Sequence, residues 1–277
     1  MTVLVVVTLA SCGVVAVRGA TDVVARSARV RVAAAKPLTV TVTNPVPTKV
    51  PAPLVAAATP PAASPLAAAP PGPAQLVRTG PVTSNAVALS FDDGTCADCI
   101  GTIVNGVEAT GAHITLCPNG VYASAWGQYA ARIRAQIALG RVAICNHTFS
   151  HLDLTRLSDD QVRAQITTNE DWIQATFGVN PRPFLRPPYG AYNARVLAVA
   201  GSLGYSVMAL WSAVLGDDTT GPQPDVGPVV DRAAGPGAIV LAHANREKTA
   251  NGFYEMVSVI SRKGLATATL PELFGAA

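Results

Sequence analysis

Two histidines four positions apart, His147 and His151 in the segment NHTFSH, are the first residues whose types and spacing indicate chemistry. Residues at this spacing on a helical turn or in a tight loop face the same way. Two imidazoles and one carboxylate are a common ligand set for a catalytic zinc ion, which keeps a further position open for water. A histidine pair alone is more often structural, so this interpretation requires a carboxylate from another part of the chain.

Two adjacent carboxylates, Asp92 and Asp93 in the segment LSFDDGT, are candidates for that role. They directly follow VALSF, an apolar run of strand length. Neighbouring side chains at a strand end point in different directions, so one carboxylate can bind a metal while the other faces a reacting water. The competing interpretation is a plain turn, because Asp-Gly is common in turns.

Arg186 and His243 also stand at the ends of apolar runs, in FLRPPYG and IVLAH. An arginine before two prolines is held rigidly and can orient a carboxylate, whereas the competing interpretation is a Pro-Pro turn. A lone histidine is more often a satisfied core or rim residue. Even so, three of the four histidines of the chain follow predicted strands, which places them at one end of the domain.

Apolar runs of strand length must position these residues, and most are continuous, as in strands that are buried on both faces. They cover residues 87–91, 113–117, 141–145, 183–187, 205–210, 238–242 and 265–270. Helical patterns lie between them, over 158–177, with Ser158 and Gln161 as a capping box and Gly178 at its end, and over 122–139. The alternation predicts an α/β fold with a parallel sheet, open or closed into a barrel, and chemistry at the carboxyl ends of the strands.

The chain divides by composition into three parts. Residues 1–20 contain an apolar run of about fifteen residues, shorter than the ~20 of a transmembrane helix, which predicts a secretory signal or a membrane anchor. Residues 21–80 are rich in Pro and Ala and predict a disordered linker. Residues 81–277 are long enough to form one globular domain. Export is therefore expected, to an extracellular, cell-wall or membrane-anchored location, and Cys12 is a candidate lipidation site.

Charge is unevenly distributed along the chain. Residues 1–80 carry seven Lys and Arg against one acidic residue, whereas residues 81–277 carry thirteen against sixteen. The basic N-terminal part is suited to association with an anionic membrane or with cell-wall polymers. The mildly acidic domain has no basic stripe, which argues against nucleic acid as a partner.

The segments SFDDGT, NHTFSH, RPPYG and LAH, in this order and at these separations, resemble the motifs of the NodB-type polysaccharide deacetylases, carbohydrate esterase family 4. The resemblance covers residues 81–277. It implies the fold of the NodB homology domain, a distorted (β/α)7 barrel, and an acetylated glycan as the substrate. It also implies a divalent metal, usually Zn²⁺ and in some members Co²⁺ or Ni²⁺.

The same resemblance implies a role for each matching residue. Metal ligands would be the three residues Asp93, His147 and His151. Asp92 would be the general base that takes a proton from the attacking water, and Arg186 would hold Asp92 in place. An amide is a poor electrophile and its amine leaves badly unless it is protonated, so a metal and a separate acid are both needed.

The resemblance also implies roles for three more residues, which would contact the leaving amine, the oxyanion and the acetyl group. His243 would protonate the leaving amine. The backbone N–H of Tyr189 would stabilise the oxyanion, and Leu241 would line the acetyl pocket. Donors aimed at a developing oxyanion contribute about 3–4 kcal/mol where this has been measured.

One motif departs from the family pattern, in the stretch LWSAVLGDDTTG. Trp211 and Asp217 stand at matching places, where Trp211 would contact the substrate and Asp217 would orient His243. Val214 replaces a usual aspartate, and Asp218 replaces a usual tryptophan that walls the acetyl pocket. Thr95 also replaces a usual proline, a minor change.

Four cysteines remain beyond Cys12, namely Cys96, Cys99, Cys117 and Cys145. An even count in an exported domain favours disulfides, with three possible connectivities, over a four-cysteine zinc site. If the strand order is sequential, Cys117 and Cys145 lie on neighbouring strands and can bridge, which leaves Cys96 with Cys99, or cross-pairs. Such disulfides would staple the metal-binding loops.

The function expected from these residues is metal-dependent hydrolysis of N-acetyl groups of peptidoglycan or of a chitin-like N-acetylglucosamine polymer. An O-acetyl xylan esterase is the first alternative, because the same machinery cleaves esters more easily than amides. A non-catalytic glycan-binding module with a vestigial site is the second, and the altered fourth motif is its support.

Overall fold

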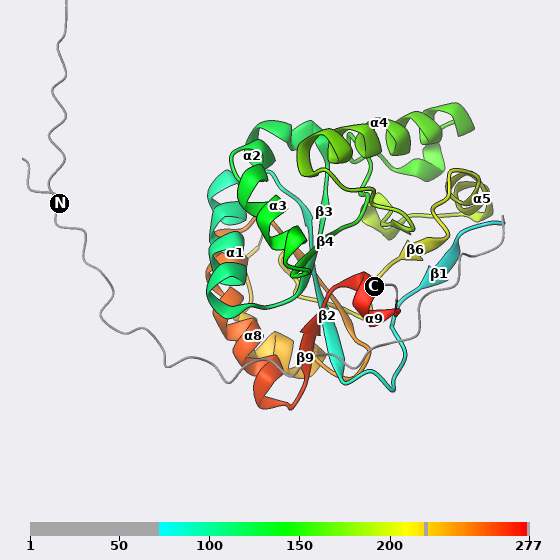
Figure 1. Cartoon of the computed structure of the whole chain (residues 1–277). Coiled ribbons are helices and arrows are strands. Elements are labelled where there is room, and N and C mark those ends of the chain that lie inside the picture. The colour runs from blue at the N-terminus through cyan, green and yellow to red at the C-terminus, as the bar shows by residue number, and fades with distance from the viewer. Residues whose placement is uncertain (1–71, 219–220, 276–277) are drawn as a thin grey trace, which may run out of the picture. The chain divides into compact units, whose positions relative to one another are not determined.

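The computed structural model describes residues 72–218 and 221–275, and their strands form two sheets of a distorted barrel (Figure 1). All strand pairs are parallel. The larger sheet has the order β4-β3-β2-β8-β7, with β9 paired to β2, and comprises β2 (Ala86–Asp93), β3 (Ile114–Pro118), β4 (Val142–Ile144), β7 (Ala213–Val214), β8 (Ile239–His243) and β9 (Ala266–Ala268). The smaller sheet has the order β1-β6-β5, from β1 (Gln75–Val77), β6 (Val207–Ala209) and β5 (Phe184–Leu185).

All seven strands expected from the sequence are present, and the predicted α/β barrel fold is confirmed. Two short strands, β1 and β7, were not expected, because two or three residues are too few to show a hydrophobic period. Strand β1 lies in the range expected to be linker, so the folded domain extends to the N-terminal side of residue 81. The segment 1–20 and most of the expected linker lie outside the described residues.

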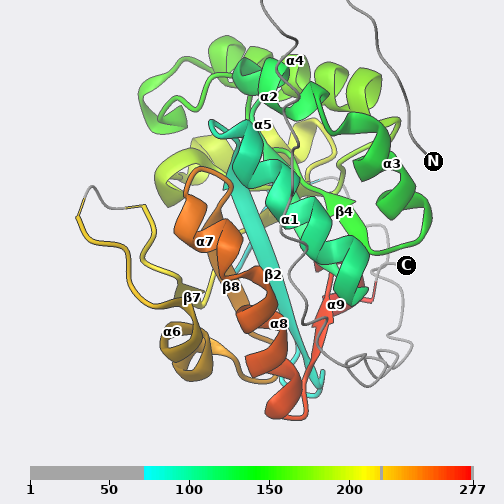
Figure 2. The ribbon, with the colours of Figure 1, turned by 90° about the vertical axis from the view of Figure 1, so that its left-hand side faces the viewer.

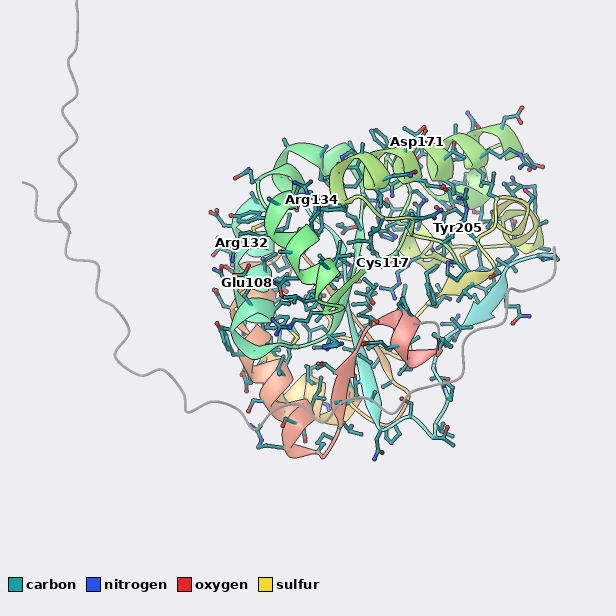
Figure 3. All side chains as sticks on the ribbon, viewed as in Figure 1. Glu108, Cys117, Arg132, Arg134, Asp171 and Tyr205 are labelled. Atoms are coloured by element: carbon teal, nitrogen blue, oxygen red, sulfur yellow. A yellow bond between two sulfur atoms is a disulfide. The ribbon has the colours of Figure 1, made fainter. Side chains whose placement is uncertain are left out.

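Helices pack around the outside of the strands, with α1, α7 and α8 along the face of β2 and β8 (Figure 2). They are α1 (Ala97–Thr110), α2 (Ala123–Gly127), α3 (Ala130–Ala138), α4 (Asp159–Phe177), α5 (Ala194–Ser202), α6 (Val226–Ala233), α7 (Glu247–Asn251), α8 (Phe253–Arg262) and α9 (Leu270–Leu273). A surface ion pair between Glu108 and Arg132 joins α1 to α3, with 2.5 Å between Oε2 and Nη2 (Figure 3). No helix in the described part of the chain has the length and apolar character needed to cross a membrane.

The two expected helices have different outcomes. The prediction for 158–177 is confirmed by α4, where Ser158 and Gln161 exchange both hydrogen bonds of a capping box. The prediction of one helix over 122–139 is wrong, because the chain breaks between α2 and α3. Glycine at position 127 weakens the helix there, and the break lets Trp126 turn inward, where its Nε1 donates to the carbonyl of Asp93 at 2.8 Å.

Strand β2 separates the two main parts of the core by its alternating side chains. Val87, Leu89 and Phe91 pack with the outer helices, whereas Ala86 and Ala88 pack inside the barrel. Because side chains alternate along a strand, Ser90 and Asp92 continue the inward row. Inside the barrel the small alanines pack in a cluster with larger side chains such as Phe184 and Leu270, and the polar end of the row lies at the carboxyl edge of the strands.

Two disulfides are present in the described domain, and both link cysteine pairs that were considered from the sequence. Cys117 and Cys145 directly follow the paired residues Leu116 and Ile144 of β3 and β4, and their Cα atoms lie 4.6 Å apart. Cys96 and Cys99 bridge the first turn of α1. The buried bridge lies immediately before the loop that contains the paired histidines.

We expect the buried disulfide to contribute more to stability than the one in α1. Cys117 and Cys145 are 28 positions apart, whereas Cys96 and Cys99 are three apart. The loop-entropy relation gives about 3–4 kcal/mol for the first and about 2 kcal/mol for the second. Urea unfolding of the double variants C117A/C145A and C96A/C99A, compared with the unmodified chain, measures the difference. Equal losses, or four thiols that react with iodoacetamide before reduction, would contradict the assignment.

Candidate active site

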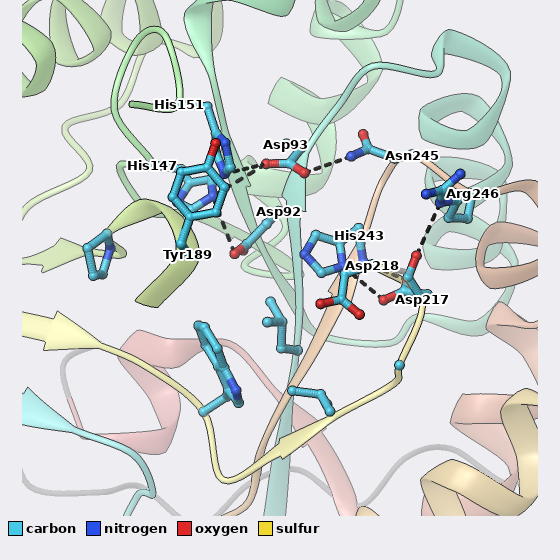
Figure 4. Close-up of a pocket in the computed structure, with 15 residues that line it drawn as sticks. Asp92, Asp93, His147, His151, Tyr189, Asp217, Asp218, His243, Asn245 and Arg246 are labelled. Carbon is cyan, nitrogen blue, oxygen red and sulfur yellow. Dashed lines mark hydrogen bonds and ion pairs between the residues drawn. The ribbon is translucent and has the colours of Figure 1, made fainter. Parts of the chain in front are cut away.

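Three side chains converge at the carboxyl edge of β2 to form a candidate metal site (Figure 4). The Oδ1 atom of Asp93 lies 3.4 Å from Nε2 of His147 and 3.3 Å from Nε2 of His151. One donor atom from each residue lies within 4.8 Å of the others. The structure therefore brings together the carboxylate and the histidine pair that the sequence placed 54 and 58 positions apart.

The donor atoms are arranged as a divalent metal requires. Asp93 Oδ1 is buried and has no hydrogen-bond partner among the described residues, which is uncommon for a carboxylate oxygen. The Nδ1 atom of His147 lies 2.8 Å from the carbonyl oxygen of Arg186. That carbonyl only accepts, so Nδ1 carries the proton and the Nε2 lone pair faces Asp93. Two imidazole nitrogens and one carboxylate oxygen suit Zn²⁺.

Left-handed backbone conformations aim these ligands. Asp93, Thr148 and His151 have φ values of 72°, 66° and 56°, a region that costs residues other than glycine free energy. Asp93 follows Phe91 in the outward row of β2, and the turn at Asp93 directs its carboxylate to the histidine pair. Asn119 holds the histidine loop, because its Nδ2 donates to the carbonyls of His147 and Thr148 at 2.5 and 2.8 Å.

Asn245 supports the metal-facing carboxylate from the side opposite the histidines. Its Nδ2 donates to Asp93 Oδ2 at 2.7 Å, and its Oδ1 accepts from the backbone N–H groups of Gly94 and Thr95 at 3.0 and 2.7 Å. This leaves Oδ1 of Asp93 for the metal. Sequence analysis missed Asn245, although it stands two residues after His243, at the carboxyl end of β8.

Asp92 lies beside the metal site and is held by Arg186, with 2.7 Å between Oδ1 and Nη1. Both side chains are buried, with exposed fractions of 2% and 0%. The same guanidinium donates to Ser90 Oγ and to the carbonyl of Ala209. The other oxygen of Asp92, Oδ2, lies 3.5 Å from Nε2 of His147. One oxygen is therefore committed to Arg186, and the other faces the site.

His243 lies at the end of β8 and is fixed by Asp217. The carboxylate Oδ1 is 2.8 Å from His243 Nδ1, while Oδ2 accepts from the His243 backbone N–H and from Thr249 Oγ1. Burial lowers the pKa of His243, but the hydrogen bond with Asp217 and nearby carboxylates outweigh it and raise this pKa to about 9. The imidazole is thus held protonated at neutral pH.

Charges within the metal site shift the pKa values of its ligands. Burial opposes ionisation of Asp93, but its close contact with His147 and the positive charges of protonated His147 and His151 hold its pKa well below the usual range. Burial also opposes a charge on His147, and Asp92 and Asp93 outweigh it, so the pKa of His147 is raised. Burial lowers the pKa of His151, and repulsion from His147 adds to the effect.

A pocket of about 300 Å³ opens over these groups. Besides the carboxylates and imidazoles already described, its lining includes Tyr189, Trp211 and Leu241, as expected from the sequence. Arg186 lies behind Asp92, outside the lining. Tyr189 has a φ of 60° and packs its ring against His151, with centroids 4.6 Å apart. The lining also contains Val214 and Asp218, the two departures of the fourth motif, and Asn245 and Arg246.

We expect Asn245→Ala to weaken metal binding by about 10- to 100-fold, because residues that hold a ligand carboxylate tune affinity by this amount. Asn251→Ala, on the exposed end of α7, is the matched control and should bind like the unmodified chain. Competition with a chromogenic zinc chelator measures the affinity directly. Equal affinity in the two variants would show that Asn245 does not support the site.

We expect His243 in metal-free protein to titrate near pH 9, and Asp217→Asn to move its pKa toward ~6.5, the value for an unfolded chain. A folded-state pKa above the unfolded value means that the protonated pair stabilises the fold fully below about pH 6.5. This stabilisation is then lost as the pH rises through about 9. NMR titration after chelator treatment measures both forms, and an unchanged pKa in the variant would contradict the role of Asp217.

Comparisons with known proteins agree with this geometry. The family model described as Polysaccharide deacetylase matches residues 79–208. A chitin deacetylase from Pestalotiopsis sp is 30% identical over 211 residues, which span 73% of this chain and 68% of that protein. A peptidoglycan-N-acetylglucosamine deacetylase from Bacillus cereus is 28% identical over 203 residues, which span 71% of this chain and 70% of that protein.

Solved structures share the fold. A peptidoglycan N-acetylglucosamine deacetylase superposes with a TM-score of 0.65 at 24% identity, over 73% of this chain and 94% of that chain. A pseudoenzyme of carbohydrate esterase family 4 from Bacillus anthracis superposes with a TM-score of 0.63 at 21% identity, over 72% of this chain and 68% of that chain. The matching family model and the 30% identical chitin deacetylase show that the chain belongs to the polysaccharide deacetylase family, and the solved structures agree with it in fold.

Proposed function

We propose that this protein is a metal-dependent deacetylase that hydrolyses N-acetyl groups of a glycan, either peptidoglycan or a chitin-like N-acetylglucosamine polymer. The observation that carries the proposal is one pocket lined by a candidate metal-ligand triad, by the Asp92 carboxylate beside it and by His243, which Asp217 holds. The relatives named for chitin and for peptidoglycan deacetylation support this substrate class.

Asp93, His147 and His151 would hold the metal, and we propose Zn²⁺ because of their nitrogen and oxygen donors. When bound there, the ion would supply Lewis-acid chemistry, namely polarisation of the acetamide carbonyl and a pKa of water lowered toward ~7. Co²⁺ and Ni²⁺ accept the same donors.

Asp92 would act as the general base. Arg186 binds Oδ1, so Oδ2 is directed toward the site, where it can take a proton from the water that attacks the carbonyl carbon. Arg186 also compensates the buried charge of Asp92, because both groups are removed from solvent. The pair therefore holds the base in one orientation, with Oδ2 toward the site.

His243 would act as the general acid. Its Nδ1 is engaged by Asp217, so the proton on Nε2 is the one available to the leaving nitrogen as the C–N bond breaks. The products are acetate and a free amine on the sugar. The backbone N–H of Tyr189 would donate to the oxyanion, and Trp211 and Leu241 would bound the acetyl pocket.

Two alternatives keep the same site. An O-acetyl xylan esterase would use the same groups on an ester. A glycan-binding module is favoured by the altered positions Val214 and Asp218, and the family includes a pseudoenzyme. Retention of both carboxylates, both metal-facing imidazoles and the His243–Asp217 pair supports the enzyme.

We also propose that the protein is exported. Two disulfides in the described domain support an oxidising compartment, as do relatives that act on peptidoglycan. Residues 1–20 would then serve as a signal or anchor, with lipidation of Cys12 as one form of it, and residues 21–71 would tether the domain to the membrane or cell wall.

Acetate release by the full chain, loaded with Zn²⁺ or Co²⁺, tests the reaction. N-acetylglucosamine oligomers and peptidoglycan should release acetate, and Asp92→Asn should lower kcat by about 10²- to 10⁴-fold, because the base is lost. The exposed Asp160→Asn is the matched control and should keep full activity. Release from acetylated xylan alone would assign the esterase reaction. Metal and glycan binding without release from any substrate would assign the binding module.

A further inference from the structure

Asp218 and its neighbour Asp217 are adjacent carboxylates with opposite surroundings. Asp217 is 2% exposed, and its oxygens accept from His243 and Thr249. Asp218 is exposed and lines the pocket that contains the catalytic candidates. In Figure 4 its carboxylate is drawn just below the His243 ring, whereas Arg246 lies beyond Asp217. Asp217 thus binds His243, whereas the Asp218 carboxylate is accessible to a ligand in the pocket.

The other carboxylates of the pocket are occupied by the protein itself. Asp92 is paired with Arg186, and Asp217 with His243. Asp93 faces two imidazoles and Asn245. No residue in the described ranges forms an ion pair or a side-chain hydrogen bond with the Asp218 carboxylate. Its carboxylate is therefore available to a ligand that enters the pocket.

Asp218 is exposed at the pocket, so a substituent of an entering ligand can reach its carboxylate. Val214 lines the same side and is 49% exposed. The fourth motif of the family places an aspartate and a tryptophan at these two positions. Here Val214 replaces the aspartate and Asp218 replaces the tryptophan, so an aromatic contact is removed and the one carboxylate stands at the second position instead of the first. Trp211 is the aromatic side chain that remains on this side.

A carboxylate at this place distinguishes glycans by charge. A neighbouring sugar with an acetamide is neutral, one with a free amine is cationic, and one with a lactyl ether carboxylate is anionic. An ammonium within a few ångströms of Asp218 is attracted, and a carboxylate is repelled. The pocket is open to solvent on this side, so the effect is screened and moderate.

We propose that Asp218 is a specificity-determining residue, which favours glycans with a free amino group beside the target acetamide and disfavours those with a carboxylate there. The proposal rests on the proposed function and narrows its substrate class to partly deacetylated N-acetylglucosamine polymer over glycan that contains muramic acid. Asp218 recognises the neighbouring sugar and takes no part in bond breaking.

Three substrates of equal length and different charge test the proposal. They are a fully acetylated chitooligosaccharide, a partly deacetylated one and a peptide-free peptidoglycan fragment. We expect Asp218→Asn to reduce the kcat/KM preference for the partly deacetylated over the muramic substrate by about three- to ten-fold. The neutral substrate should change by less than about twofold. The same preference in the unmodified chain should shrink as ionic strength rises.

Asp171→Asn is the matched control, because Asp171 is an exposed aspartate on the outer surface of α4 (Figure 3). It should leave the preference unchanged. An unchanged preference in Asp218→Asn, or an equal loss on all three substrates, would overturn the proposal. If no substrate releases acetate, the proposed function fails separately. In that case, calorimetry measures the Kd values of the zinc-loaded chain and of Asp218→Asn for the same three glycans. The ratio of the Kd values for the partly deacetylated and the muramic glycan then shows whether Asp218 distinguishes glycans by charge.

Discussion

The active-site end of the barrel depends on the buried guanidinium of Arg186. Burying a charge is costly unless it is paired and hydrogen-bonded, and here Asp92, Ser90 and the carbonyl of Ala209 all accept from it. These partners lie on β2 and β6, which belong to different sheets. Removing one partner of such a pair typically costs about 3–5 kcal/mol, because the other is left buried and uncompensated. The ion pair therefore couples closure of the barrel to the position of the proposed base.

The backbone of Arg186 also positions a ligand of the candidate metal site. The carbonyl of Arg186 accepts from His147 Nδ1, and its N–H donates to the carbonyl of Asn146. A rotation of this segment would move the base and a metal ligand together. This shared support explains why a Pro-Pro segment follows directly, since the two prolines limit the backbone freedom of the residues that carry both contacts.

Strained backbone conformations, and the hydrogen bonds that hold them, are concentrated around the candidate metal site. The residues other than glycine with positive φ in the described ranges are Asp93, Thr148, His151 and Tyr189, at the end of β2 and in the segments that surround the metal site. Such conformations persist where surrounding contacts determine them. Hydrogen bonds from the amides of Asn119 and Asn245 supply these contacts. The deep half of the pocket is thus held by buried networks, whereas Val214 and Asp218 are exposed.

Much of the fold follows from local sequence patterns. Continuous apolar runs predicted the seven main strands, the capping box of Ser158 predicted the start of α4, and the positions of the carboxylates and histidines after strands predicted where they meet. These features depend on periodicity and on short-range hydrogen bonds, which neighbouring residues determine. The break between α2 and α3 did not follow, because Trp126 gains a hydrogen bond to Asp93, 33 positions away, that outweighs the helical pattern.

The sequence by itself determined which residues carry the candidate chemistry, since their types and their places after strands are local properties. Only the tertiary structure decided what holds them in position. Asn245 contacts Asp93 across 152 positions, and Arg186 contacts Asp92 across 94. Arg186 was inferred as the support of Asp92 through a family motif, whereas Asn245 has no such signal. Hydrogen bonds between distant residues leave no local period in the chain, so they exist only once the strands are packed side by side.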